Sequence, residues 1–61
     1  NARRSLVALS PIKKGQIIMN GQLTWKRPAT GIPPSEIDNV IGKKAVRDIL
    51  DDEIINWDMI Y

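Results

Sequence analysis

The chain has 61 residues, 43% of them hydrophobic, and carries nine Lys and Arg against seven Asp and Glu, for a formal net charge of +2. A chain of this length buries only about 60% of the surface that it exposes when unfolded, so it supports one small core and no deep active site of its own. It contains neither cysteine nor histidine, which excludes disulfides and the usual zinc sites, and its small charge excess argues against nucleic acid as a partner.

The first half of the chain reads as short strands separated by tight turns. Residues 5–10 form an apolar run that suits a buried strand, and Lys13-Lys14-Gly15 marks the turn after it. Residues 16–19 are apolar again and are followed by Asn20-Gly21, a strong turn signal. Residues 23–27 alternate between apolar and polar side chains, which predicts a half-buried strand.

The middle of the chain predicts an irregular loop and then one short helix. Proline and glycine recur between residues 28 and 34, which excludes a regular helix or a central strand there. Ser35 is suited to cap a helix that Gly42 would end. Between these two residues, one face of the helix is apolar at Ile37, Val40 and Ile41.

The last third of the chain resembles the first third when the sequence is shifted by 37 residues. Residues 43–47 then match the first predicted strand, and the acidic turn Asp51-Asp52 matches Lys14-Gly15. The apolar pairs that come into register are Ala8 with Ala45, Ile12 with Ile49, Ile17 with Ile54, Ile18 with Ile55, and Leu23 with Ile60. Two such copies can bury their apolar faces against each other, which one copy cannot do alone. The alternative is a chance match in an apolar-rich chain.

These elements predict a compact, mostly β domain with short helical turns and an internal pseudo-two-fold repeat. The expected core consists of Leu6, Ala8, Ile12, Ile17, Leu23, Ile37, Val40, Ile41, Ala45, Ile49, Ile54 and Ile60. Trp25 and Trp57 are expected to plug this core partially, because no basic groove connects them as a platform for single-stranded nucleic acid.

Several segments together resemble one known family. They are Arg3-Arg4-Ser5-Leu6-Val7-Ala8, Ile12-Lys13-Lys14-Gly15, Lys26-Arg27-Pro28-Ala29-Thr30-Gly31-Ile32, Gly42-Lys43-Lys44-Ala45 and Arg47-Asp48-Ile49. In this combination they are similar to the C-terminal antifreeze-like (SAF) domain of bacterial sialic acid synthases, which make N-acetylneuraminate or legionaminate. Type III antifreeze proteins share that β-clip fold. The resemblance implies that residues 1–61 are a single SAF domain and that the parent's (β/α)8 catalytic barrel is absent from this chain.

The resemblance also implies what the parent protein does. In that family, the barrel condenses phosphoenolpyruvate with N-acetylmannosamine or a related acetamido sugar, and a divalent metal, typically manganese, is bound in the barrel. The enzymes are domain-swapped homodimers, in which the antifreeze-like domain caps the barrel of the neighbouring protomer. No catalytic residue, metal ligand or cofactor is carried over onto this chain, so the isolated domain is expected to be inert as an enzyme.

Arg27 matches the family arginine that binds the acetamido group of the sugar. A guanidinium presents several hydrogen-bond donors in a planar fork. Pro28 has a fixed φ of its own and biases the backbone of Arg27 toward extended conformations. Thr30 and Gly31 let the loop turn after it. Ala29 departs from the family, which often carries glycine there. From the residues alone, the favoured interpretation of Arg27 is an exposed cation at the end of a strand, and only the resemblance favours a contact with the substrate.

Two other functions remain open for this chain, and several of its charged residues are expected to have no specific function. An ice-binding protein is one alternative, but Lys13 and Lys14 place two strongly hydrated charges on the turn that would face ice. A free-standing SAF interaction module is another. The paired basic residues, Arg3-Arg4 among them, and the acidic run of residues 51–53 are expected to be solvated surface. With no apolar signal segment and no stretch near the roughly 18 residues of a membrane helix, a cytoplasmic location without a membrane partner is expected.

Overall fold

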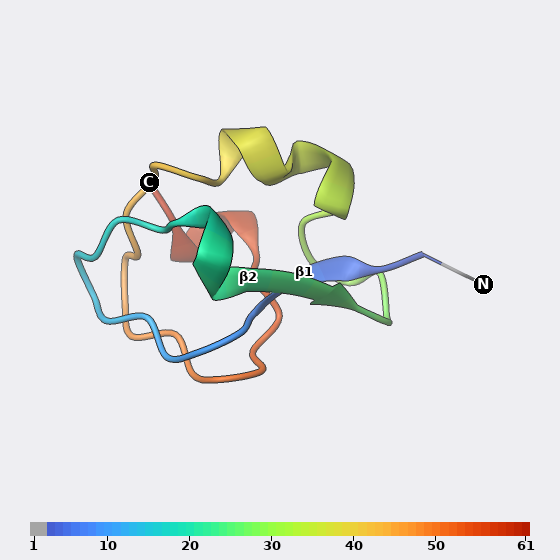
Figure 1. Cartoon of the computed structure of the whole chain (residues 1–61), viewed down its shortest axis with the longest axis horizontal. Coiled ribbons are helices and arrows are strands. Elements are labelled where there is room, and N and C mark those ends of the chain that lie inside the picture. Colours follow the sequence, from blue (N-terminus) through green and yellow to red (C-terminus); the bar gives the residue numbers. More distant parts are fainter. Residues whose placement is uncertain (1–2) are drawn as a thin grey trace.

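The computed structural model describes residues 3–61, and its chain folds around one antiparallel pair of strands. Its elements in chain order are β1 (Ser5–Ala8), the 3-10 helix η1 (Asn20–Gln22), β2 (Leu23–Lys26) and the 3-10 helices η2 (Pro34–Asn39) and η3 (Trp57–Met59). Strands β1 and β2 lie side by side across the middle of the molecule, with Ser5 opposite Lys26 and Ala8 opposite Leu23 (Figure 1). Apart from this pair of strands, the β pairing found among residues 3–61 consists of isolated bridges.

The single bridges reveal the predicted repeat as a pseudo-two-fold arrangement. They join Val7 with Ile54, Ile12 with Ile49, Ile17 with Lys44, and Ala45 with Ile60. A shift of 37 residues converts the third of these bridges into the first, and it places the fourth on the Ala8–Leu23 pair of the sheet. The bridge between Ile12 and Ile49 maps onto itself, with reciprocal N–H···O distances of 2.9 and 2.7 Å, and therefore lies on the pseudo-axis.

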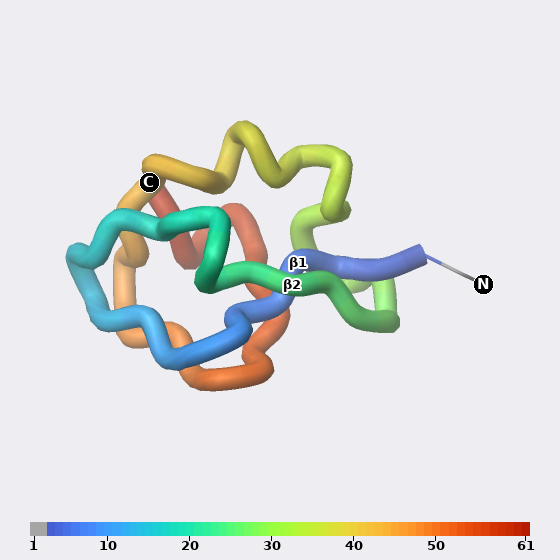
Figure 2. The backbone as a smooth tube through the Cα atoms, in the orientation of Figure 1, coloured from blue at the N-terminus to red at the C-terminus, as the bar shows by residue number. Residues whose placement is uncertain are grey.

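The turns of the two halves are equivalent as well. Gly15 and Asp52, 37 residues apart, are both left-handed, with φ values of 84° and 68°. Helices η1 and η3 begin at Asn20 and Trp57, which are separated by the same shift. Figure 2 shows the two halves wound around each other rather than stacked as separate lobes. The internal repeat predicted from the sequence is therefore confirmed.

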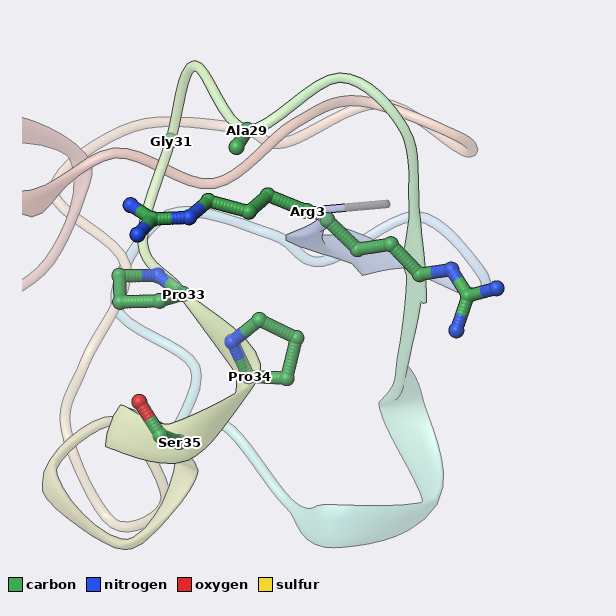
Figure 3. Close-up of a pocket in the computed structure, with 7 residues that line it drawn as sticks. Arg3, Ala29, Gly31, Pro33, Pro34 and Ser35 are labelled. Carbon is green, nitrogen blue, oxygen red and sulfur yellow. The ribbon is translucent and has the colours of Figure 1, made fainter. Parts of the chain in front are cut away.

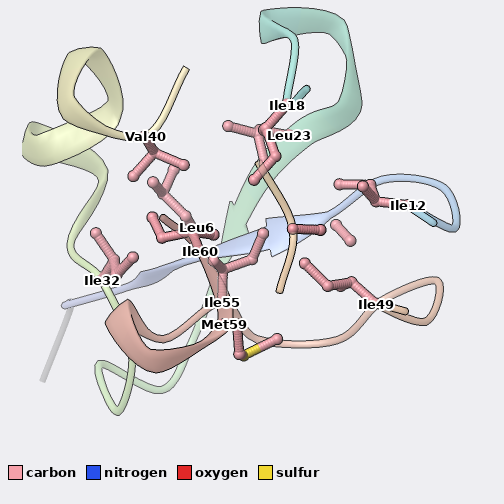
Figure 4. Packing of buried hydrophobic residues seen from close by; sticks show 12 residues of the cluster. Leu6, Ile12, Ile18, Leu23, Ile32, Val40, Ile49, Ile55, Met59 and Ile60 are labelled. Carbon is pink, nitrogen blue, oxygen red and sulfur yellow. The ribbon is translucent and has the colours of Figure 1, made fainter. Parts of the chain in front are cut away.

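Most of the predicted core residues are buried, but two that were predicted to face the core do not take core positions. The buried apolar cluster contains Leu6, Ala8, Ile12, Ile18, Leu23, Ile32, Val40, Ala45, Ile49, Ile55, Met59 and Ile60 (Figure 4), with Ile37 and Ile41 packed against it. Ile17 was expected in this core and is 50% exposed, whereas Ile18 is completely buried. In the second half, Ile54 is only partly buried and Ile55 takes the core position. Because bridging fixes the register in both halves together, the same one-residue shift occurs twice.

The predicted helix forms, with a different start. Pro33 occupies the N-cap position and Pro34 the first turn of η2, so the prediction that Ser35 would cap the helix is wrong. Proline suits the first turn because its missing N–H would have no partner there. The helix ends at Asn39 with Val40 as its C-cap, so the prediction that Gly42 would end it is wrong. Gly42 lies in the turn that follows, where its φ of 90° is a left-handed conformation that suits glycine. No helix among residues 3–61 has the length and apolar character needed to cross a membrane.

Candidate functional site

Arg27 lies immediately after β2, at the start of the loop that leads to η2. Its side chain is exposed and forms no ion pair or hydrogen bond with other residues of the described range 3–61. The peptide bond between Arg27 and Pro28 is cis. The guanidinium is therefore exposed and unpaired within residues 3–61, which is expected both of a surface cation and of an arginine that contacts a group outside this domain.

Ser5 holds the loop that follows Arg27. The Ser5 side chain is completely buried, and its hydroxyl donates a hydrogen bond to the Pro28 carbonyl at 2.6 Å. The same oxygen accepts a hydrogen bond from the Gly31 N–H at 2.9 Å. One buried hydroxyl therefore clamps both ends of the turn formed by residues 28–31. Ser5 was predicted only as part of a buried strand and not as a site residue, because its hydroxyl's partners, Pro28 and Gly31, are distant in the sequence.

Gly31 is required by a close approach of the loop to the second half of the molecule. A Cβ atom at Gly31 would lie 2.5 Å from the Ile54 Cγ2 and 2.5 Å from the Ile55 carbonyl oxygen. The next residue, Ile32, is buried and donates from its N–H to that same Ile55 carbonyl at 2.9 Å, while its own carbonyl accepts from Leu6 N–H at 2.8 Å. The loop is thus inserted between the two halves as a fixed part of the fold.

Lys26, the residue before Arg27, also makes a contact with the second half of the chain. Lys26 forms an ion pair with Asp52 in the turn of the second half, and the hydrogen bond from this pairing raises the pKa of Lys26. Lys26 thus connects β2 to that turn, and the Ser5 clamp holds Pro28. Of the other predicted site residues, Thr30 is exposed on the loop, and Pro28 and Gly31 serve the loop's shape rather than presenting polar side chains.

A groove lies beside this loop, on the side of η2. It has a volume of about 540 Å³ and is lined by Arg3, Arg4, Ala29, Gly31, Pro33, Pro34 and Ser35. Figure 3 shows the rings of Pro33 and Pro34 and the Ser35 side chain on one side, and Ala29 and Gly31 on the other. Arg27 does not line the groove. The two arginines that the sequence assigned to ordinary surface therefore share a cavity.

The acidic run of residues 51–53 serves the fold. Asp52 pairs with Lys26, and Glu53 accepts hydrogen bonds from Arg47 Nη2 at 2.9 Å and from Leu50 N–H at 2.9 Å. In the part of the chain that the structure describes, no three acidic side chains converge in a way that could hold a metal ion.

Glu53 gives this turn a defined pH dependence. The hydrogen bond from Arg47, and then the one from Leu50, lower the pKa of Glu53 below its ordinary value of 4.5. A carboxyl group whose pKa falls on folding stabilises the folded state at pH values above its pKa in the unfolded chain. That stabilisation is lost as the pH drops through its pKa in the folded state. Because the pair is largely exposed, the loss should be at most about 1 kcal/mol.

The matched variant is Glu53→Gln. At the equivalent position of the first half, Gln16 already accepts the Lys13 N–H at 2.8 Å, so an amide can keep the backbone bond. We expect urea unfolding at pH 7 and at pH 3 to differ less for Glu53→Gln than for the wild type. An identical pH dependence in both proteins would contradict this role for Glu53.

Comparison with known proteins places this arrangement in a family. Residues 3–60 match the model of the SAF domain. The chain is 47% identical over 53 residues to N,N'-diacetyllegionaminic acid synthase of Campylobacter jejuni, a match that covers 87% of this chain and 16% of that protein. It is 34% identical over 58 residues to the enzyme of the same name from Legionella pneumophila, covering 95% of this chain and 16% of that protein.

A solved structure agrees in fold. The solution structure of an antifreeze-protein-like domain in human N-acetylneuraminic acid phosphate synthase matches with a TM-score of 0.90 at 33% identity, covering 93% of this chain and 73% of that one. This chain therefore spans about one sixth of the length of the two bacterial synthases, and it is homologous to their C-terminal region. The mostly β fold with short helical turns, predicted from the sequence, is confirmed by the same match. The chain belongs to the SAF domain family.

Proposed function

We propose that this chain is the accessory domain of a sialic acid synthase, and that Arg27 binds the acetamido group of the sugar substrate. The parent would carry a (β/α)8 barrel that condenses phosphoenolpyruvate with an N-acetylmannosamine-type sugar, with a divalent metal, manganese by family resemblance, held in that barrel. The homodimer would exchange these domains, so that each caps the barrel of the partner protomer. The proposed location is the cytoplasm.

The observation that carries this proposal is the contrast between Arg27 and its surroundings. Lys26 is paired with Asp52, and the Pro28 carbonyl is bonded to the buried Ser5 hydroxyl, whereas the exposed Arg27 side chain has no partner within residues 3–61. A backbone fixed on both sides lowers the ordering cost of binding. A guanidinium can donate to an amide oxygen and keeps its charge at every physiological pH.

Arg27→Ala in the synthase that carries this domain is the direct test. Hydrogen bonds to charged groups contribute about 1.5–3 kcal/mol, so we expect the KM for the acetamido sugar to rise about 10- to 100-fold. The KM for phosphoenolpyruvate should change much less. Arg27→Lys should recover only part of the loss, because an ammonium lacks the planar fork.

Arg47→Ala is the matched control, because Arg47 is also an exposed arginine but is paired with Glu53. It should leave the KM for the sugar unchanged. If Arg27→Ala leaves the sugar kinetics unchanged as well, Arg27 is not the contact. Ice binding is the weaker alternative, since Lys13 and Lys14 are both exposed on their turn. If the isolated chain shows thermal hysteresis, ice binding becomes the preferred function and the synthase proposal the weaker one.

A further inference from the structure

We propose that Ser5 is a positioning residue for Arg27, and that it sets the affinity of the domain for the acetamido sugar without touching that sugar. The inference rests on the function proposed above for Arg27. Ser5 is completely buried, so any effect that it has on a ligand must pass through the residues that it contacts. Those contacts lie on both sides of Arg27 in the sequence.

The backbone of Ser5 holds the residue before Arg27. Ser5 is the partner of Lys26 in the register of β1 and β2, at the end of the paired strands. The next residue, Leu6, donates its N–H outside this pair, to the Ile32 carbonyl at 2.8 Å. Because backbone groups alternate between the two sides of an antiparallel strand, those of Ser5 point toward Lys26. The strand that delivers Arg27 is therefore fixed by Ser5 at its last position.

The hydroxyl of Ser5 holds the residues after Arg27. It donates to the Pro28 carbonyl at 2.6 Å and accepts from the Gly31 N–H at 2.9 Å. One residue thus fixes the chain immediately before Arg27, immediately after it and at the far end of the turn. The direction in which the exposed Arg27 side chain leaves the domain follows from these three attachments.

No other group can easily take over the two hydrogen bonds of the hydroxyl. The site is closed to solvent, because Ser5 is completely buried. Removing the hydroxyl would leave the Pro28 carbonyl and the Gly31 N–H without this partner, and a buried polar group without a partner is unfavourable. The loop would have to shift to satisfy them. Arg27 would then have to be ordered anew whenever the sugar binds, which weakens binding.

A double-mutant cycle in the synthase that carries this domain tests the inference. Ser5→Ala should raise the KM for the acetamido sugar about 3- to 10-fold and leave the KM for phosphoenolpyruvate unchanged. In the Arg27→Ala background, Ser5→Ala should raise the sugar KM no further, because the residue through which it acts is gone. A serine that only stabilises the domain would change the sugar KM by the same factor in both backgrounds.

Two further variants separate positioning from stability. Ile49→Val removes one methylene from a buried residue at the other end of the core from Ile32 (Figure 4). It should lower the Tm by about 5 °C and leave the sugar KM unchanged. Ser5→Cys keeps a side chain of similar size but offers only a weak donor and acceptor. Its sugar KM should lie between those of the wild type and Ser5→Ala, and it provides the test if Ser5→Ala does not fold.

The outcomes distinguish this inference from the function proposed for Arg27. If Arg27→Ala raises the sugar KM while Ser5→Ala and Ser5→Cys leave it unchanged, Ser5 is not a positioning residue and the role of Arg27 stands. Equal factors for Ser5→Ala in both backgrounds would overturn the positioning role in the same way. If Arg27→Ala itself leaves the sugar KM unchanged, the proposed function is wrong and the role of Ser5 fails with it.

Discussion

Gly31→Ala should destabilise the domain by about 2–4 kcal/mol, because the added methyl group has no space. Its Cβ would lie 2.5 Å from both the Ile54 Cγ2 and the Ile55 carbonyl oxygen, and no rotamer can relieve a clash made by Cβ itself. Relief requires the backbone to move, and that backbone donates hydrogen bonds from Gly31 N–H to Ser5 Oγ and from Ile32 N–H to the Ile55 carbonyl.

The expected loss is large for a chain of this size. A 61-residue domain has a total stability of about 3–9 kcal/mol, and each kcal/mol corresponds to about 4–8 °C in Tm. Gly31→Ala should therefore lower the Tm by about 10 °C or more in a thermal unfolding experiment followed by circular dichroism. Any loss of Arg27 function in this variant would follow from the displaced loop.

Gly21→Ala is the control. Nothing lies within 4 Å of a Cβ built at Gly21, and its φ is not in the left-handed region. Alanine should be neutral there or stabilise the fold by about 0.4–1 kcal/mol, because it reduces the freedom of the unfolded chain. Equal stabilities of the two variants would show that the loop does not approach Ile55 as closely as described.

Ile18→Ala should cost about 2–5 kcal/mol, whereas Ile17→Ala should cost less than about 1 kcal/mol. Ile18 is completely buried in the core cluster, and Ile17, its neighbour in sequence, is 50% exposed. The two substitutions delete the same atoms from adjacent positions, so their difference measures burial alone. Urea unfolding of both variants provides the comparison, and similar losses would mean that the register of this segment is wrong.

The Ile17–Ile18 pair also shows where prediction from sequence reaches its limit. The repeat, its two turns and the left-handed turn at Gly42 were predictable, because turn residues and apolar spacing are local signals. Two consecutive isoleucines contain no alternation, so neither pattern nor propensity decides which one faces inward. The bridge from Ile17 to Lys44 decides it, and that contact joins distant parts of the chain.

The candidate site was predictable only in part. Arg27 stands out through the motif around it, but the buried Ser5 clamp and the groove at Arg3 and Arg4 depend on how the loop of residues 28–34 folds back onto the start of β1. The helix start was missed for a local reason, since Pro34 fits the first turn and thereby displaces Ser35 from the N-cap. No metal or cofactor is expected on this chain, and that expectation stays a prediction.

The reciprocal pairing of the two halves determines how the domain reaches its native state. Strand β1 pairs with β2 within the first half of the chain, but bridges such as Val7 with Ile54 and Ile12 with Ile49 join the two halves. The shared core therefore cannot close before distant parts of the chain meet. Proteins dominated by such distant contacts fold slowly for their length, and the entropy of closing the long loop must be overcome before many contacts form. Because each half buries its apolar residues against the other, unfolding should be all-or-none, and the loop that carries Arg27 should unfold together with the domain.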